Sequence, residues 1–544
     1  MRKAIVSIIL VITCITSSMA GYRNPIIPGF YPDPSVVRVG QDYYLVNSTF
    51  QFFPGVPLWH SRDLVHWEQL GNVLDRESQL PLKGANCWLG IYAPTIRYHE
   101  GRFYMITTNV GSGPGNFIVT ADVPKGTPTD RIPELFRSGK LTWSDPIWLK
   151  QGGIDPSLLF EDGKCYMTSN PDAGIWICEI DPRTGEQLTE SKRIWDGTGG
   201  RHPEAPHLYK KDGYYYLMIA EGGTEVGHMV TIARSRSPYG PYESNPDNPI
   251  LFHWRKAAQS NPIQGTGHAD LVEAHDGSWW MVNLAFRPTS GNNHHLGRET
   301  FLAPVEWNKE GWPVVNGNGT IDMDMNVRTL PSVTYPSLPE HQTFQGKMGP
   351  EWMYLCNPHM GNYSVKDGRL FLRAEAGKSL DTEGETLTFV ARRQQHIDCC
   401  FGTEVTLLNK GIGYEVGLTV YATGSSHYDV YLTRKASGDI ALCLRYRLNE
   451  VTHQEAEVIL PRNCDSARIK VETTAEQYHF LCSTDNGETW ASLGKISSRY
   501  ISSECAGGFT GTVIGLFAVN PRHTLAPLSP TASFACFDYK SAEK

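Results

Sequence analysis

Three acidic residues and one histidine stand in short motifs that lie far apart in the sequence. Asp33 and Asp155 each precede a Pro-Ser pair, Glu204 lies in a Pro-Glu-Ala-Pro run, and His268 ends a Gly-Thr-Gly-His run. Two carboxyl groups in one pocket suit glycoside cleavage, with one as acid and one as base or nucleophile. Several carboxylates together also suit a hard cation, and a single Asp-Pro is an ordinary turn signal. The chemistry therefore depends on whether the fold brings these residues together.

A repeat in the first 300 residues places them at matching positions. Each of five copies starts with a polar or small residue, continues with apolar-leaning residues and a polar turn, and ends with paired aromatic or apolar residues. Each copy predicts a β-hairpin. The copies start roughly 50 to 65 residues apart, near the length of one four-stranded propeller blade. Their first residues are Asp33, Ala93, Asp155, Ala205 and His268, with Glu204 one position ahead of Ala205.

The repeat predicts an all-β protein with a five-bladed β-propeller over residues 21–330. The innermost strand of each propeller blade begins near the central axis, so we expect the matching residues to converge there. Residues 331–340 are rich in Pro and Ser and predict a linker. Residues 341–544 show alternating runs between turns, which predicts a C-terminal β-sandwich of the jelly-roll type.

Composition and the N-terminus restrict the class of protein. The 49 Lys and Arg against 57 Asp and Glu give a net charge of −8, which argues against a nucleic-acid partner. Residues 1–20 combine a basic start, a short apolar run and a Ser-Met-Ala site, and predict a cleaved signal peptide. We therefore expect an exported protein, periplasmic or secreted, without membrane insertion; a short N-terminal anchor is the alternative. The 12 cysteines form no CxxC or zinc pattern, and we expect mostly buried free thiols.

Three segments resemble the motifs of glycoside hydrolase family 43. They are Tyr31-Pro32-Asp33-Pro34-Ser35, Gly153-Ile154-Asp155-Pro156-Ser157 and Arg201-His202-Pro203-Glu204-Ala205-Pro206, in that order. The resemblance implies that Asp33 is the general base of an inverting mechanism and Glu204 the general acid. It implies that Asp155 orients the acid and tunes its pKa.

Further segments resemble the xylosidase and arabinofuranosidase branch of that family. They imply that Phe50, His268 and Arg298 bind the sugar, and that Phe509 reaches the pocket from a loop of the sandwich. Tyr92 stands where many xylosidases of this branch have Trp, and we expect it in the same pocket wall. This chemistry needs no cofactor and we assign no metal ligands, while the resemblance allows a structural Ca²⁺ near His268.

These features predict an exo-acting glycosidase that releases a terminal or side-chain pentose, α-L-arabinofuranose, from plant hemicellulose oligosaccharides or polysaccharides. One alternative is a β-D-xylosidase that acts on xylo-oligosaccharides. Another, of a different class, is a glycan-binding propeller without catalysis. A third alternative is the fructan hydrolases, which also have five-bladed propellers. They usually show an Arg-Asp-Pro motif, and Ile154 before Asp155 in this chain argues against them. The polymer, the oligomeric state and carbohydrate binding by the sandwich stay open at this level.

Overall fold

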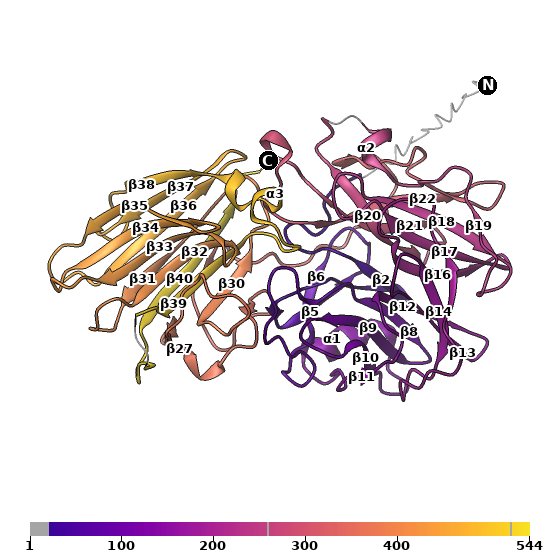
Figure 1. Cartoon of the computed structure of the whole chain (residues 1–544), viewed down its shortest axis with the longest axis horizontal. Coiled ribbons are helices and arrows are strands. Elements are labelled where there is room, and N and C mark those ends of the chain that lie inside the picture. Colours follow the sequence, from indigo (N-terminus) through magenta and orange to yellow (C-terminus); the bar gives the residue numbers. More distant parts are fainter. Residues whose placement is uncertain (1–20, 258–259, 523–524, 544) are drawn as a thin grey trace, which may run out of the picture.

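The computed structural model describes residues 21–257, 260–522 and 525–543. Two bodies whose regular secondary structure is almost all β-strand lie side by side, with the earlier part of the chain in one and the later part in the other (Figure 1). The predicted fold class, a five-bladed propeller followed by a β-sandwich, is confirmed. The predicted signal peptide falls on residues outside the described part. No helix in the described residues is long and apolar enough to cross a membrane.

Five antiparallel sheets form the blades. The first contains β2 (Ser35–Val39), β3 (Asp42–Val46), β5 (Gly55–Ser61) and β6 (Glu68–Leu74). The second contains β7 (Gly90–Ile91), β8 (Thr95–His99), β9 (Arg102–Val110), β10 (Gly115–Asp122) and β11 (Ile147–Trp148). The third contains β12 (Ile154–Glu161), β13 (Lys164–Asn170), β14 (Ile175–Ile180) and β15 (Lys192–Trp195). The fourth contains β16 (Glu204–Lys211), β17 (Tyr214–Glu221), β18 (Met229–Ser235) and β19 (Glu243–Ser244). The fifth contains β20 (Gln264–Glu273), β21 (Trp279–Phe286), β22 (Glu299–Trp307) and β23 (Pro313–Val315).

The strands that open the repeat copies surround the propeller axis. Strands β2, β8, β12, β16 and β20 contact one another in a closed ring. The paired aromatic residues of each copy lie on the next strand and fill the space between blades, as Tyr44 does beside Phe103 with ring centroids 4.9 Å apart. The two ends of the propeller meet where β1 (Tyr22–Arg23) pairs with β24 (Asp324–Met325). The ring explains how acids so distant in sequence come within reach of one another.

The C-terminal body is a sandwich of two sheets around one apolar core, which contains Trp352, Phe401, Tyr428 and Phe534. The first sheet holds β25 (His341–Gln342), β27 (Tyr363–Lys366), β28 (Arg369–Leu372), β31 (Cys399–Leu407), β36 (Ser466–Thr473), β37 (Gln477–Ser483), β38 (Ala491–Ser497) and β40 (Ala532–Ser541). The second holds β29 (Glu375–Ala376), β30 (Phe389–Arg393), β32 (Glu415–Thr423), β33 (Ser426–Arg434), β34 (Ile440–Leu448), β35 (Val451–Ile459) and β39 (Val513–Asn520).

Helices are few and short among the described residues. The α-helices are α1 (Ile132–Arg137), α2 (His253–Lys256) and α3 (Ser503–Ala506). The 3₁₀ turns are η1 (Thr129–Arg131), η2 (Ser290–Asn292), η3 (Met360–Asn362) and η4 (Ser498–Ile501). The eleven described cysteines are all free and eight of them are buried, which confirms the prediction of buried thiols.

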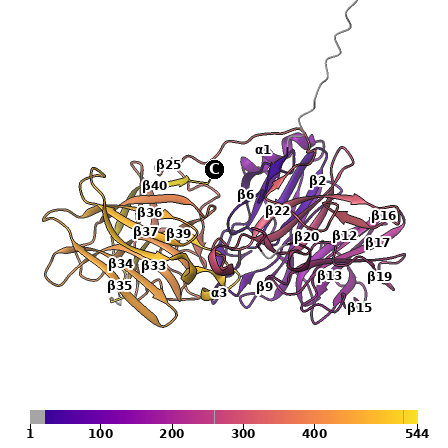
Figure 2. The same cartoon turned by 90° about the horizontal axis from the view of Figure 1, so that it is seen from above.

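The sandwich is joined to the propeller by backbone contacts. Strand β4 (Phe52–Phe53) of the propeller pairs with β26 (Tyr354–Leu355) after the linker. Both views place α3 at the boundary between the two bodies (Figures 1 and 2). The segment between α3 and β39 runs along the propeller, where Phe509 N donates to Cys87 O at 2.9 Å. This segment carries a sandwich residue to the mouth of the propeller.

Candidate active site

Four of the five repeat copies begin with a residue in the left-handed backbone region. The angle φ is 53° at Asp33, 53° at Asp155, 54° at Ala205 and 44° at His268. Strand pairing shifts around the last three of these residues, as in a β-bulge, which re-aims a side chain. Residues other than glycine adopt this conformation at a cost and concentrate at functional sites. The shared backbone geometry supports the alignment of the repeats.

Blade four supplies its acid from a different position. Ala205 occupies the left-handed site, so the carboxyl group comes from Glu204, the first residue of β16. The Ala205 N–H donates to Oδ2 of Asp155 at 3.1 Å. This bond fixes the Asp155 carboxyl group beside the backbone that carries Glu204, from a neighbouring blade.

Asp33 is buried but surrounded by groups that favour its charged form. Arg298 Nη1 donates to Asp33 Oδ1 at 3.0 Å, and Ser48 Oγ donates to Oδ2. His268 Nδ1 lies 3.6 Å from Oδ1. Burial raises the pKa of Asp33, but the Arg298 guanidinium, then His268 and Ser48, outweigh it and hold the pKa below its ordinary value. Asp33 is therefore held as a carboxylate that can accept a proton.

Asp155 shows the opposite shift. Burial, followed by the negative charges of Glu204 and Asp33, raises the pKa of Asp155 well above its ordinary value. The Glu204 side chain is 18% exposed, whereas Asp155 is buried. The site therefore favours the protonated form of Asp155, and Glu204 beside it is the carboxyl group that is open to a substrate.

Aromatic rings build one wall of the site. Phe50 lies 5.2 Å from Tyr92 and 5.6 Å from Phe509, measured between ring centroids. The Arg298 guanidinium carbon lies 5.6 Å from the centroids of both phenylalanines. Tyr92 donates its hydroxyl to Trp88 O at 2.5 Å, and burial, then the charge of Asp155, raises its pKa to about 12. The structure thus brings all eight residues selected from the sequence into one connected site.

A polar cluster fills the propeller axis two residues along β20 from His268. Arg97 Nη1 donates to Asp270 Oδ2 at 2.9 Å, and Arg97 Nη2 lies 3.0 Å from His207 Nδ1. Burial lowers the pKa of His207 to about 3. A Ca²⁺ ion prefers six to eight oxygen ligands, but here a guanidinium already faces the Asp270 carboxylate, and Asp33 is bonded to Arg298. The residues around His268 do not fit a Ca²⁺ site.

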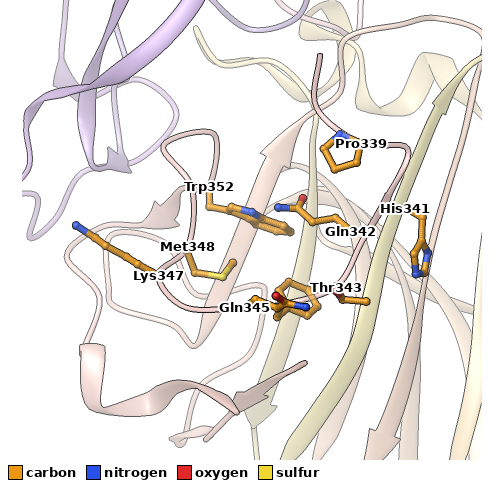
Figure 3. A pocket seen from close by; sticks show the side chains of 10 residues that line it. Pro339, His341, Gln342, Thr343, Gln345, Lys347, Met348 and Trp352 are labelled. Carbon is orange, nitrogen blue, oxygen red and sulfur yellow. The ribbon is translucent and has the colours of Figure 1, made fainter. Parts of the chain in front are cut away.

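Another cluster of possible metal ligands lies on the sandwich, beside a cavity of about 300 Å³ (Figure 3). His341 Nδ1 and Asp538 Oδ1 are 2.5 Å apart, and Cys536 Sγ lies 3.7 Å from Asp538 Oδ2. Two ligands about 2.0 Å from a tetrahedral zinc would stand roughly 3.3 Å apart. The 2.5 Å separation is that of a hydrogen bond, which accounts for this pair without an ion.

Sequence reasoning missed several residues of the site. Thr224 Oγ1 accepts from Arg298 Nη1 at 3.0 Å, and His228 Nε2 lies 3.6 Å from Glu204 Oε1. Both belong to one Gly-rich segment directly after β17, and this glycine content beside a repeat hairpin is the signal that could have indicated them. Trp88 packs edge-on against Phe509 with centroids 4.9 Å apart, a contact that depends on domain docking.

Comparison with known proteins identifies the two bodies. A model described as glycosyl hydrolases family 43 matches residues 22–313, and one described as a beta xylosidase C-terminal concanavalin A-like domain matches residues 341–540. The chain belongs to glycoside hydrolase family 43. As a family 43 member it is a glycosidase acting on arabinofuranose or xylose. Family membership favours the catalytic prediction over the glycan-binding alternative.

Relatives that match this chain over most of its length are named for activity on arabinose and on xylose. The chain is 38% identical over 524 residues to a non-reducing end alpha-L-arabinofuranosidase of Bacteroides ovatus, covering 95% of this chain and 94% of that protein. It is 38% identical over 532 residues to a xylosidase/arabinosidase of Butyrivibrio fibrisolvens, covering 91% and 95%. The solved structure of Bacteroides ovatus xyloglucan PUL GH43B matches with a TM-score of 0.88 and 39% identity, covering 96% of this chain and 100% of that chain.

Proposed function

We propose that this family 43 enzyme is an exo-acting, inverting α-L-arabinofuranosidase that removes single arabinofuranose units from plant hemicellulose. The observation that carries the proposal is the opposed electrostatics of the acids. The Arg298 guanidinium helps to hold the pKa of Asp33 below its ordinary value, while burial and the charge of Glu204 raise the pKa of Asp155. Carboxyl groups whose surroundings push their pKa values apart suit the separate acid and base sides of single-step glycoside hydrolysis.

In the proposed reaction, Glu204 protonates the glycosidic oxygen as the bond to the anomeric carbon breaks. Asp33 takes a proton from the water that attacks the opposite face of that carbon. Asp155 takes no part in bond making; it holds the backbone next to Glu204. An inverting pair needs room for the water, with the two carboxyl groups roughly 6.5 to 9.5 Å apart.

Exo action is supported by the contribution of the sandwich. Phe509 packs against Phe50 and Trp88 of the propeller, so a loop of the second domain closes one side of the aromatic wall. A pocket closed on one side admits a chain end or a side branch but not the middle of a polymer. We therefore expect monosaccharide as the product, and mixed oligosaccharides released from a polymer would contradict exo action.

The stereochemistry and the sugar are tested together. Proton NMR of the first turnovers on an aryl α-L-arabinofuranoside should show the β-anomer of arabinofuranose before mutarotation. Initial formation of the α-anomer would contradict inversion. Parallel kcat/KM values for aryl α-L-arabinofuranoside and aryl β-D-xyloside decide the sugar, and a higher value for the xyloside would contradict arabinofuranose as the preferred unit.

β-D-xylosidase activity on xylo-oligosaccharides is the second candidate. Relatives at 31 to 38% identity include a beta-xylosidase of Bacillus subtilis and the Butyrivibrio fibrisolvens xylosidase/arabinosidase. Tyr92 favours arabinofuranose, because it stands where many xylosidases of the resembling branch have Trp. The Tyr92→Trp variant should therefore raise the ratio of xyloside to arabinofuranoside kcat/KM, and an unchanged ratio would remove this support.

We also propose that the enzyme works without a cofactor and is exported after cleavage near Gly21. The Arg97–Asp270 ion pair supports a propeller axis stabilised by the Arg97 side chain instead of a metal ion. The value of kcat/KM should therefore be unchanged after treatment with a chelator.

The N-terminal residues 1–20 support export. Mass spectrometry of the mature chain tests the cleavage site.

A further inference from the structure

His228 is a buried histidine beside Glu204 that the proposed reaction does not use. Its side chain is 0% exposed, and its Nε2 lies 3.6 Å from Glu204 Oε1. Neither ring nitrogen has a hydrogen-bond partner among the described residues. A buried polar group without a partner is costly and uncommon in folded proteins. An apolar side chain would fill the same space without this cost, so the imidazole requires an explanation.

The surrounding backbone is shaped to hold this ring. A Cβ atom on Gly267 would lie 2.3 Å from His228 Nδ1, so only glycine at position 267 allows the ring its place. A Cβ atom on Gly222 would lie 1.9 Å from Gly227 O, so the turn that leads into His228 also needs glycine. Gly222 has φ of 97°, a region that favours glycine. The ring is therefore fixed against β20, with Nε2 3.6 Å from Glu204 Oε1.

The same segment touches both halves of the acid–base machinery. Thr224 accepts a hydrogen bond from Arg298, which in turn holds Asp33, and four residues later His228 faces Glu204. The segment therefore links the base side of the site to the acid side. A proton on His228 Nε2 would face Oε1 of Glu204. The other carboxyl oxygen, Oε2, is then left for the substrate.

We propose that His228 is a positioning residue for Glu204. Its Nε2–H donates to Oε1 as Glu204 gives its proton to the leaving oxygen, so the new carboxylate is stabilised and its other oxygen stays aimed at the glycosidic bond. His228 keeps its own proton throughout; the leaving group takes the proton of Glu204, and Asp33 takes the proton of the attacking water. This inference rests on the proposed roles of Glu204 and Asp33.

A leaving-group comparison separates this role from a structural one. His228→Leu removes the donor at similar volume, and His228→Gln keeps an N–H near the position of Nε2. A hydrogen bond to a charged group corresponds to about a 10- to 100-fold rate effect. We expect His228→Leu to lose this factor in kcat on phenyl α-L-arabinofuranoside, which needs protonation. On the 2,4-dinitrophenyl glycoside, which leaves without it, we expect a loss several-fold smaller, and His228→Gln should recover most of the activity.

Stability gives the second measurement. Because the imidazole has no hydrogen-bond partner to lose, His228→Leu should melt at or above the temperature of the wild type. His295 is the matched control, since it is also buried with both ring nitrogens unpartnered among the described residues. It packs on Tyr478 of the sandwich with ring centroids 5.9 Å apart. His295→Leu should leave the ratio of the two leaving-group rates unchanged.

Several results would overturn the inference. They are equal losses on the two glycosides, no loss on either, a Gln variant as impaired as the Leu variant, a lower melting temperature or failure to fold of His228→Leu, or a changed rate ratio in His295→Leu. Failure of the proposed function looks different: the wild type itself would not hydrolyse the arabinofuranosides. If it hydrolyses the xylosides instead, the same pair of leaving groups is used on xylose.

Discussion

Replacing Arg298 with Met removes the cation that keeps Asp33 ionised. Their hydrogen bond is 3.0 Å long, and the side chains are 7% and 5% exposed. Unit charges about 4 Å apart interact by about 4 kcal/mol at an effective dielectric constant of about 20. Ser48 and His268 stay in place and water enters the space, so we expect part of this stabilisation to remain and the pKa of Asp33 to rise.

The sign of the effect on activity follows from the role of Asp33 as a base. Because the base must be ionised, a higher pKa of Asp33 moves the acidic limb of the kcat/KM profile to higher pH. The assay is kcat/KM on an aryl α-L-arabinofuranoside from pH 3 to 9. Arg298→Lys keeps the charge and should leave the limb close to its wild-type position. A lower kcat/KM with an unmoved acidic limb in Arg298→Met would refute the reasoning and restrict Arg298 to sugar binding.

Three further predictions concern the acid, the domain contact and the sandwich. Glu204→Ala should lower kcat about 10²- to 10⁴-fold on phenyl arabinofuranoside and far less on the dinitrophenyl glycoside; equal losses in steady-state assays would exclude it as the acid. Phe509→Ala should lower kcat/KM roughly 10- to 100-fold with little change in melting temperature, and a melting temperature that falls with activity would indicate a docking role instead. In the sandwich, burial lowers the pKa of His427, but Asp429 and Asp381 outweigh it and raise the pKa to about 9. The stability that this histidine contributes is then complete below its ordinary pKa of 6.5 and lost as the pH rises through about 9. The difference in melting temperature between wild type and His427→Gln should shrink over that range, and a constant difference would contradict it.

The repeat allowed the fold to be predicted, and it led to the prediction that the three acids lie close together. Each hairpin is a local structure, so its turn and its paired aromatic residues can be recognised within about 15 residues of sequence. Propeller closure then fixes where the first residue of each copy must lie. The structure adds a backbone reason, since Asp33, Asp155, Ala205 and His268 share a left-handed φ. Blade two departs from the four-stranded pattern of the other blades. Its β9 pairs with two strands on the same side, β8 and the short strand β7 that precedes β8 in the sequence.

The repeat did not predict which distant segments contact one another in the site. The resemblance indicated Arg298 and Phe509 as site residues, but their partners depend on how the blades and the sandwich meet. Arg298 bonds to both Asp33 and Thr224, and Phe509 reaches Trp88. The segment after β17 supplies both Thr224 and His228 to the site because its Gly-rich turn packs against β20. No local sequence pattern specifies that packing.

The sequence by itself determined the all-β architecture and predicted the three acids, because local periodicity indicates the strands and the repeat puts the acids at matched positions. Only the tertiary structure decided the direction in which the pKa of Asp33 and the pKa of Asp155 shift. Asp33 lies just before β2 and Asp155 near the start of β12, with the same backbone angle φ, yet their pKa values move in opposite directions. The physical reason is that a pKa depends on burial and on the charges within a few ångströms. For Asp33 the deciding charge is Arg298, 265 residues away in the chain.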